Sequence, residues 1–114
     1  LSGDRYWMRR DGLALDAGPF VAALEYATGI RPTVSGKPST EFFRAAVHSL
    51  GLPETTDLRE VVMVGDDLWS DVQGAQQAGL SGWLVRTGKY REDAVTASGI
   101  HPDRILTSVA EFVE

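Results

Sequence analysis

The residues most able to do chemistry form a carboxylate cluster directly after an apolar run. The run Val61–Val64 is rich in β-branched residues, which is typical of a strand buried in a parallel sheet. Gly65 permits a tight exit from that strand, and Asp66, Asp67 and Asp71 follow it. Grouped carboxylates repel one another unless a cation neutralises them, and Mg²⁺ prefers oxygen ligands. The cluster therefore predicts a magnesium site at the carboxyl end of a strand, where open α/β sheets bind their ligands.

A second candidate group is Lys37, which precedes Asp66 by 29 positions. Pro38 biases the residue before it towards extended geometry, so Lys37 should project from a strand end instead of joining the next helix. A lysine in that place can neutralise a carboxylate or contact a phosphate as a point charge. The loop Gly36–Ser39 does not have the glycine spacing of a P-loop. Each motif alone also fits an ordinary polar turn or surface loop, and it is their combination that favours a site.

Composition limits the classes of partner. The chain has 114 residues, no cysteine and a net charge of -5. This charge disfavours a nucleic-acid surface, although Arg5, Arg9 and Arg10 form a short basic cluster. Without cysteine there is no disulfide, thiolate metal site or cysteine nucleophile. No apolar run approaches the length of a membrane span and no signal-like segment opens the chain, so we expect a cytoplasmic protein without nucleic-acid or membrane partners.

The flanking sequence predicts alternating strands and helices. Apolar residues recur at helical spacing in three segments, and shorter apolar runs mark strands. The expected helices are Gly18–Thr28, Thr40–Leu50 and Asp71–Ala78. The expected strands are Arg5–Arg9, Thr33–Ser35, Val61–Val64 and Trp83–Val85, and after a loop the terminal segment Ile105–Val113 is expected to be helical. This alternation predicts an α/β fold of βαβ units around a parallel sheet.

Two of these motifs carry a resemblance to a known family. Gly36-Lys37-Pro38-Ser39 resembles the third motif of the haloacid dehalogenase (HAD) superfamily of phosphatases, and Gly65–Asp71 resembles its fourth. Further stretches are similar to the NagD-like subfamily, which carries an α/β cap; they are 16–30, 74–79 and Val85–Lys89. The resemblance implies a HAD-like Rossmannoid core, in which helices flank a parallel sheet.

The resemblance also implies a division of the chain. In the family, an Asp-x-Asp nucleophile motif and a Ser or Thr motif come before the third motif. No Asp-x-Asp occurs here, and only 36 residues precede Lys37. We therefore expect residues 1–30 to be the C-terminal remnant of the cap and residues 31–114 to be the C-terminal half of the catalytic core. Such a chain should not hydrolyse phosphate esters by itself.

Roles for the matching residues follow from the same resemblance. Asp66 is expected to bind Mg²⁺, with Asp67 or Asp71 as a candidate second contact through water. Lys37 is expected to contact the phosphate and the nucleophile, and Asp71 to support it. The substrate would be a small phosphorylated molecule, cleaved by attack of an aspartate on phosphorus and then by water. Trp69, which lies among these acids, is expected to pack against the protein instead of facing the substrate.

Two other functions fit parts of the sequence. A response-regulator receiver has about this length, but it needs an acid pair on its first strand and an aspartate on a later one, whereas Arg86-Thr87 follow the strand here. A non-catalytic binding or assembly module derived from the HAD fold is the stronger alternative. An Asp-x-Asp segment in the complete protein would favour the enzyme over that module. An incomplete sheet would expose strand edges, so a homo-oligomer is also expected.

Overall fold

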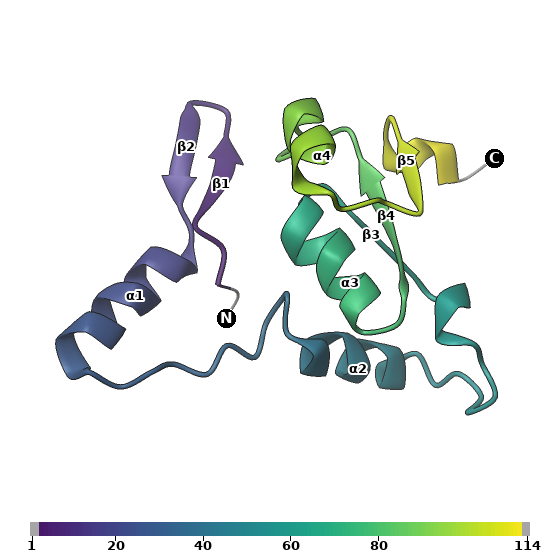
Figure 1. Cartoon of the computed structure of the whole chain (residues 1–114), viewed down its shortest axis with the longest axis horizontal. Helices are drawn as coiled ribbons and strands as arrows, with labels where there is room; N and C mark the ends of the chain where they lie inside the picture. The colour runs from purple at the N-terminus through teal and green to yellow at the C-terminus, as the bar shows by residue number, and fades with distance from the viewer. Residues whose placement is uncertain (1–2, 113–114) are drawn as a thin grey trace.

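The N-terminal part of the chain is a hairpin followed by a helix. The protein is described by a computed structural model that covers residues 3–112 (Figure 1). Two antiparallel strands, with Tyr6 opposite Leu15, form the hairpin; they are β1 (Tyr6–Arg9) and β2 (Gly12–Leu15). The helix is α1 (Ala17–Thr28), whose first N–H group donates to the side chain of Asp16. Figure 1 shows this hairpin unit beside the rest of the molecule, joined to it by an extended segment.

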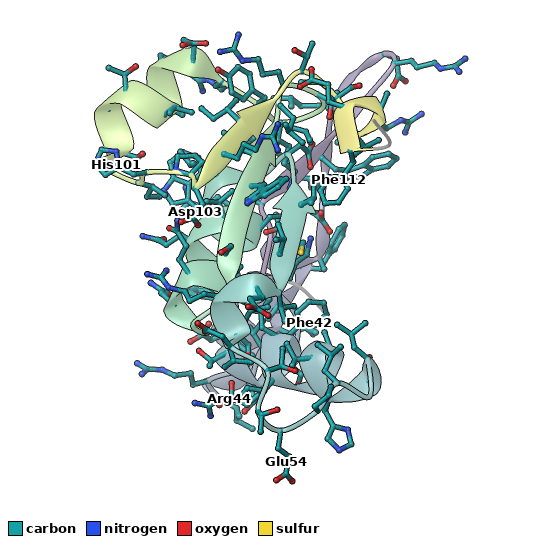
Figure 2. The ribbon with its side chains drawn as sticks, turned by 90° about the vertical axis from the view of Figure 1, so that its right-hand side faces the viewer. Phe42, Arg44, Glu54, His101, Asp103 and Phe112 are labelled. Carbon is teal, nitrogen blue, oxygen red and sulfur yellow. The ribbon has the colours of Figure 1, made fainter. Side chains whose placement is uncertain are left out.

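The remainder of the chain is organised around a parallel sheet of three strands. Their order across the sheet is β3-β4-β5, and both pairs are parallel. The strands are β3 (Val62–Gly65), β4 (Ser81–Val85) and β5 (Arg104–Leu106). Asp103, labelled in Figure 2, accepts hydrogen bonds from the N–H of Gly82 at 2.8 Å and from Nε2 of Gln76 at 3.0 Å. This carboxylate thereby ties the turn before β5 to the neighbouring strand.

Helices connect the strands and supply the core. They are α2 (Thr40–Ser49), a π-helix (Leu68–Gln73) that continues into α3 (Gly74–Gln77), α4 (Glu92–Ser98), and short 3₁₀ turns at Leu58–Glu60 and Val109–Phe112. One buried cluster joins the π-helix to β4 through Val72 and Leu84, and a second joins α2 to α3 through Phe43 and Ala75. Within residues 3–112 no helix is both long and apolar enough to cross a membrane.

The predicted α/β class is confirmed, including the parallel sheet and the strand before the carboxylates. The predicted strand Thr33–Ser35 is wrong, because no strand lies beside these residues in the described part of the chain. The helix predicted for Ile105–Val113 is also wrong. Its first residues pair with β4 as β5, a 3₁₀ turn follows, and Val113 lies outside the described residues.

Two elements were missed by sequence reasoning, namely β2 and α4. The helix expected to begin at Asp71 begins three residues earlier, at Leu68, because Asp67 caps it. The Asp67 carboxylate accepts the N–H groups of Trp69 and Ser70, both at 3.0 Å. This cap fixes the side chain of Asp67 and begins the helix that carries Asp71. The assignment of residues 1–30 to a cap remnant and of residues 31–114 to the catalytic core stays a prediction.

Candidate functional site

The site is built on the segment Asp66–Asp71, called the acidic loop from here on, which leaves the carboxyl end of β3. Asp71 is its most buried acid, with 3% of the residue exposed. Its Oδ1 accepts a 2.6 Å ion-paired hydrogen bond from Nζ of Lys37, and its Oδ2 accepts the N–H of Asp67 at 3.1 Å. The structure therefore brings together two of the predicted site residues, which lie 34 positions apart in sequence.

Gly65 is needed for this arrangement. A Cβ atom at residue 65 would lie 2.0 Å from Oδ2 and 2.5 Å from Cβ of Asp71, far inside van der Waals contact. The absence of a side chain lets the strand end pass directly beside the buried carboxylate. Glycine at the last position of β3 thus allows Asp71 to turn back and hold Lys37.

Asp66 is held by the loop that follows β4. Its Oδ2 accepts the main-chain N–H of Lys89 at 2.7 Å. Gly88, at φ +51°, brings this loop so close that a Cβ there would lie 1.9 Å from the same oxygen. In the described part of the chain no basic side chain pairs with Asp66, in contrast to Asp67 and Asp71. Asp66 is thus the acid of this group whose negative charge remains available to a bound cation.

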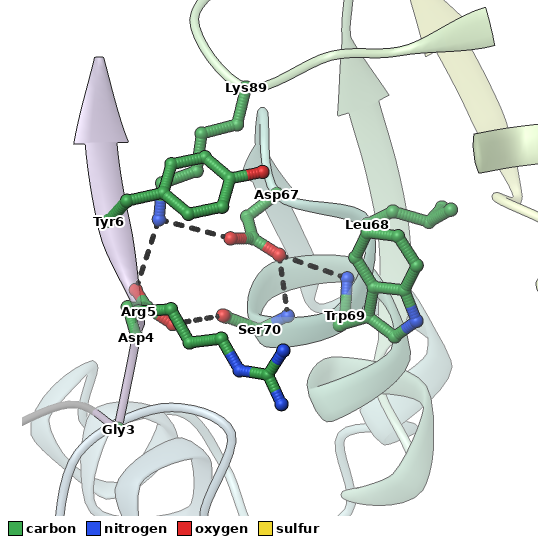
Figure 3. Close-up of a pocket in the computed structure, with 9 residues that line it drawn as sticks. All are labelled: Gly3, Asp4, Arg5, Tyr6, Asp67, Leu68, Trp69, Ser70 and Lys89. Carbon is green, nitrogen blue, oxygen red and sulfur yellow. Dashed lines mark hydrogen bonds and ion pairs between the residues drawn. The ribbon is translucent and has the colours of Figure 1, made fainter. Parts of the chain in front are cut away.

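Lys89 is the residue of this candidate site that sequence reasoning missed. Its Nζ lies 3.1 Å from Oδ2 of Asp67 and 3.4 Å from Oδ2 of Asp4, while Asp4 Oδ1 accepts the Ser70 hydroxyl at 2.6 Å (Figure 3). Lys89 therefore joins the hairpin unit to the acidic loop. The sequence did contain a signal that could have pointed to Lys89, because Lys37 and Lys89 are the only two lysines in the chain.

The charges in this cluster stabilise one another. Burial alone would favour the neutral amine of Lys89, but the hydrogen bond and charge of Asp67 and the charge of Asp4 outweigh it and raise the pKa of Lys89. Burial likewise opposes ionisation of Asp67. The N–H of Ser70 and the ammonium of Lys89 outweigh that effect and lower the pKa of Asp67. Both groups are therefore charged at neutral pH.

The described residues do not form a complete metal site. Within residues 3–112 no three Asp, Glu or His side chains converge as a metal-binding group. Asp71 is committed to Lys37, and Asp67 to Lys89 and the helix cap. Asp66 has the hard oxygen donors that Mg²⁺ prefers and no competing cation, so it fits the role of one ligand. Direct ligation by all three acids does not fit this geometry.

A cavity of about 470 Å³ opens next to the acidic loop. The segment that enters β1, the acidic loop and the loop after β4 line it together: Gly3, Asp4, Arg5, Tyr6, Asp67, Leu68, Trp69, Ser70 and Lys89 (Figure 3). The prediction that Trp69 packs against the protein is wrong, because 51% of this residue is exposed and it borders the cavity. The neighbouring Leu68 takes the buried position instead, with 4% exposed.

Comparison with known proteins identifies the family. Residues 34–112 match the family model described as HAD-hydrolase-like. The chain is 53% identical over 104 residues to haloacid dehalogenase-like hydrolase domain-containing protein 2 of Bos taurus. This alignment covers 90% of the chain and 38% of that protein. It is 41% identical over all 114 residues to human phospholysine phosphohistidine inorganic pyrophosphate phosphatase, covering 41% of that protein. The chain thus spans about two fifths of the length of these curated relatives.

Solved structures show the same relationship. A p-nitrophenyl phosphatase from Archaeoglobus fulgidus matches 98% of the chain and 43% of its own length, with a TM-score of 0.80 and 32% identity. NagD from Escherichia coli matches 96% of the chain and 41% of its own length, at 0.77 and 33%. A glycerol phosphate phosphatase from Mycobacterium tuberculosis, solved in complex with magnesium, matches 96% of the chain and 32% of its own length, also at 0.77 and 33%. The chain belongs to the HAD-like hydrolase family.

Proposed function

We propose that the complete protein is a Mg²⁺-dependent phosphatase, in which this chain supplies the lysine and the Asp66 metal ligand. The substrate would be a small phosphate monoester, phosphoamide or pyrophosphate. The observation that carries the proposal is the 2.6 Å pair of Lys37 with the buried Asp71, placed at the strand end that also bears Asp66. The phosphatases among the relatives and the magnesium complex of one neighbour support it.

Lys37 would act by offsetting the electrostatic repulsion between nucleophile and phosphate. An anionic nucleophile and an anionic phosphate repel each other, and an ammonium between them offsets that repulsion. Asp71 keeps Lys37 in place because its two oxygens are fixed by Nζ and by the N–H of Asp67. The side chain of Lys37 is 30% exposed, so it remains accessible to a ligand while its buried partner does not.

The nucleophile would be an aspartate of the complete protein outside residues 1–114, since no Asp-x-Asp occurs within them. Its carboxylate oxygen would form a bond to phosphorus while the bond from phosphorus to the leaving group breaks. Water would then hydrolyse the phospho-aspartyl group and release inorganic phosphate. Bound Mg²⁺ would supply positive charge at the phosphate oxygens, and Asp66 would be one of its ligands.

The test is release of phosphate from p-nitrophenyl phosphate by the complete protein, with Mg²⁺ and with excess chelator. We expect Mg²⁺-dependent release by the complete protein and none by residues 1–114 alone. Phosphate binding without any turnover would contradict the proposal and support the non-catalytic binding module. Turnover by residues 1–114 alone would contradict the assignment of the nucleophile to another part of the protein.

Three further expectations remain proposals. A cytoplasmic location rests on the sequence alone. The partner would be a small phosphorylated molecule, without nucleic acid or membrane. Self-association is proposed because β3 pairs only with β4 among residues 3–112, so its other side offers main-chain groups to another strand.

A further inference from the structure

The cavity beside the acidic loop lies next to the proposed phosphate site. Lys89 links the two, because its N–H donates to Asp66 while its side chain borders the cavity. Asp67, the neighbour of Asp66, also lines the cavity. A phosphate held near Asp66 and Lys37 would therefore direct the rest of its molecule towards this space. The volume of about 470 Å³ is within the usual range for sites that bind small molecules.

The charged side chains of the cavity balance one another. Asp4 and Asp67 share the ammonium of Lys89, at 3.4 and 3.1 Å, and Asp4 also accepts the Ser70 hydroxyl. Arg5 contributes a guanidinium to the lining, and in the described part of the chain it pairs with no acid. The formal charges of these two acids and two cations therefore cancel, and the lining as a whole favours neither an anion nor a cation.

Trp69 provides an apolar surface on the same cavity. Half of this residue is exposed, although its main chain is fixed by the 3.0 Å bond from its N–H to Asp67. The other aromatic lining residue, Tyr6, already faces Nζ of Lys89, which lies 5.8 Å from its ring centre. Trp69 is thus the ring that remains available for stacking, and its fixed main chain reduces the entropy lost on binding.

We propose that this cavity binds the non-phosphate part of the substrate and selects a planar aromatic group, which stacks on Trp69. The inference rests on the proposed function for the position of the phosphate. It assigns a substrate class, aromatic phosphates, and names Trp69 as the residue that determines this specificity.

The test compares two ligands that cannot be hydrolysed, benzylphosphonate and methylphosphonate, by calorimetry on the complete protein with Mg²⁺. They share the phosphonate and differ in the ring. We expect benzylphosphonate to bind about tenfold more tightly to the unchanged protein. Trp69→Ala should remove most of that preference and leave methylphosphonate binding unchanged, whereas Trp69→Phe should retain it.

Trp7 offers a matched control. It is 48% exposed, close to the 51% of Trp69, but it lies on β1 and does not line the cavity. Trp7→Ala should therefore keep the ring preference, and thermal unfolding should show that both alanine variants are folded. Equal affinity of the unchanged protein for the two phosphonates would overturn the inference. So would a ring preference that survives Trp69→Ala.

Turnover separates this inference from the proposed function. Hydrolysis of p-nitrophenyl phosphate without any preference for benzylphosphonate would overturn the aromatic pocket and leave the phosphatase standing. A Trp69-dependent preference without turnover of any phosphate ester would support the pocket and contradict the phosphatase.

Discussion

Nζ of Lys37 lies 2.6 Å from Oδ1 of Asp71, and the two residues differ sharply in accessibility. The Asp71 side chain is 4% exposed and the Lys37 side chain 30%. A buried carboxylate is costly unless it is paired and hydrogen-bonded, and Asp71 satisfies both needs through Lys37 and the N–H of Asp67. The pair therefore holds a cation in a fixed place at the rim of the site.

Replacing Asp71 by Asn should lower activity without removing any group that contacts the substrate. The amide would keep the size of the carboxylate but lose the charge that orients Lys37. We expect kcat/KM to fall by about 10- to 100-fold, the usual range for a group that positions another. Asp93→Asn is the control, because Asp93 pairs with Arg91 on the exposed surface. Equal losses in both variants would contradict the role of Asp71.

Replacing Gly65 by Ala should destabilise the protein and disturb the site together. The added methyl group would meet Asp71 at 2.0 to 2.5 Å, so the carboxylate must move away from Lys37. We expect a loss of about 1 to 3 kcal/mol in the free energy of unfolding, measured with urea. Gly3→Ala is the matched control, since its nearest neighbour would be Val34 at 3.9 Å. Unchanged stability of Gly65→Ala would show that the loop relaxes freely.

Phe43 should contribute far more to stability than its neighbour Phe42. Phe43 is 2% exposed and packs with Ala75 and Leu80, whereas Phe42 is 37% exposed. Because a buried ring leaves a cavity, Phe43→Ala should cost about 3 to 5 kcal/mol of unfolding free energy. Phe42→Ala should cost clearly less under the same denaturant. Similar costs would mean that α2 does not pack on α3 through Phe43.

The Asp67 carboxylate should make stability depend on pH at the acid end. Its pKa is lowered from the ordinary 3.8, so it binds protons less readily when folded than when unfolded. Its stabilisation is therefore complete above 3.8 and is lost as the pH falls through the folded value. Unfolding free energies of the unchanged protein and of Asp67→Asn should differ near neutral pH and converge in acid.

The control for this pH series is Asp11→Asn, because Asp11 pairs with Arg9 on an exposed turn and its side chain is 71% exposed. This variant should follow the unchanged protein throughout. A difference between Asp67→Asn and the unchanged protein that stays constant down to the acid limit would contradict the coupling of Asp67 to folding.

Part of the site could be predicted because it depends on the order of elements. Strand Val61–Val64 and helix Thr40–Leu50 have clear patterns, so the carboxylates and Lys37 could be assigned to adjoining strand and loop ends. The pairing of Lys37 with Asp71 was expected from the resemblance to the HAD motifs, and the structure brings the two side chains together. The order of elements alone was not sufficient, because the strand predicted before Lys37 is absent from the described part of the chain.

The remaining features of the fold and the site depend on contacts between distant residues, which local sequence patterns do not indicate. Lys89 follows a strand just as Asp66 does, but its link to Asp4 joins residues 85 positions apart. The short strand β5 forms because β4 accepts it, although its residues also fit a helical pattern. Trp69 could not be placed for the same reason, since exposure depends on which of Leu68 and Trp69 the π-helix turns inward.

The most direct test of the central claim is the Mg²⁺ concentration that gives half-maximal phosphate release from p-nitrophenyl phosphate by the complete protein. Asp66 has no competing side-chain cation among the described residues, so it should carry the metal. We predict that Asp66→Asn raises this concentration by about 10-fold or more, as loss of a charged oxygen ligand should, while Asp93→Asn leaves it unchanged. The same Mg²⁺ dependence in Asp66→Asn and the unchanged protein would contradict the account.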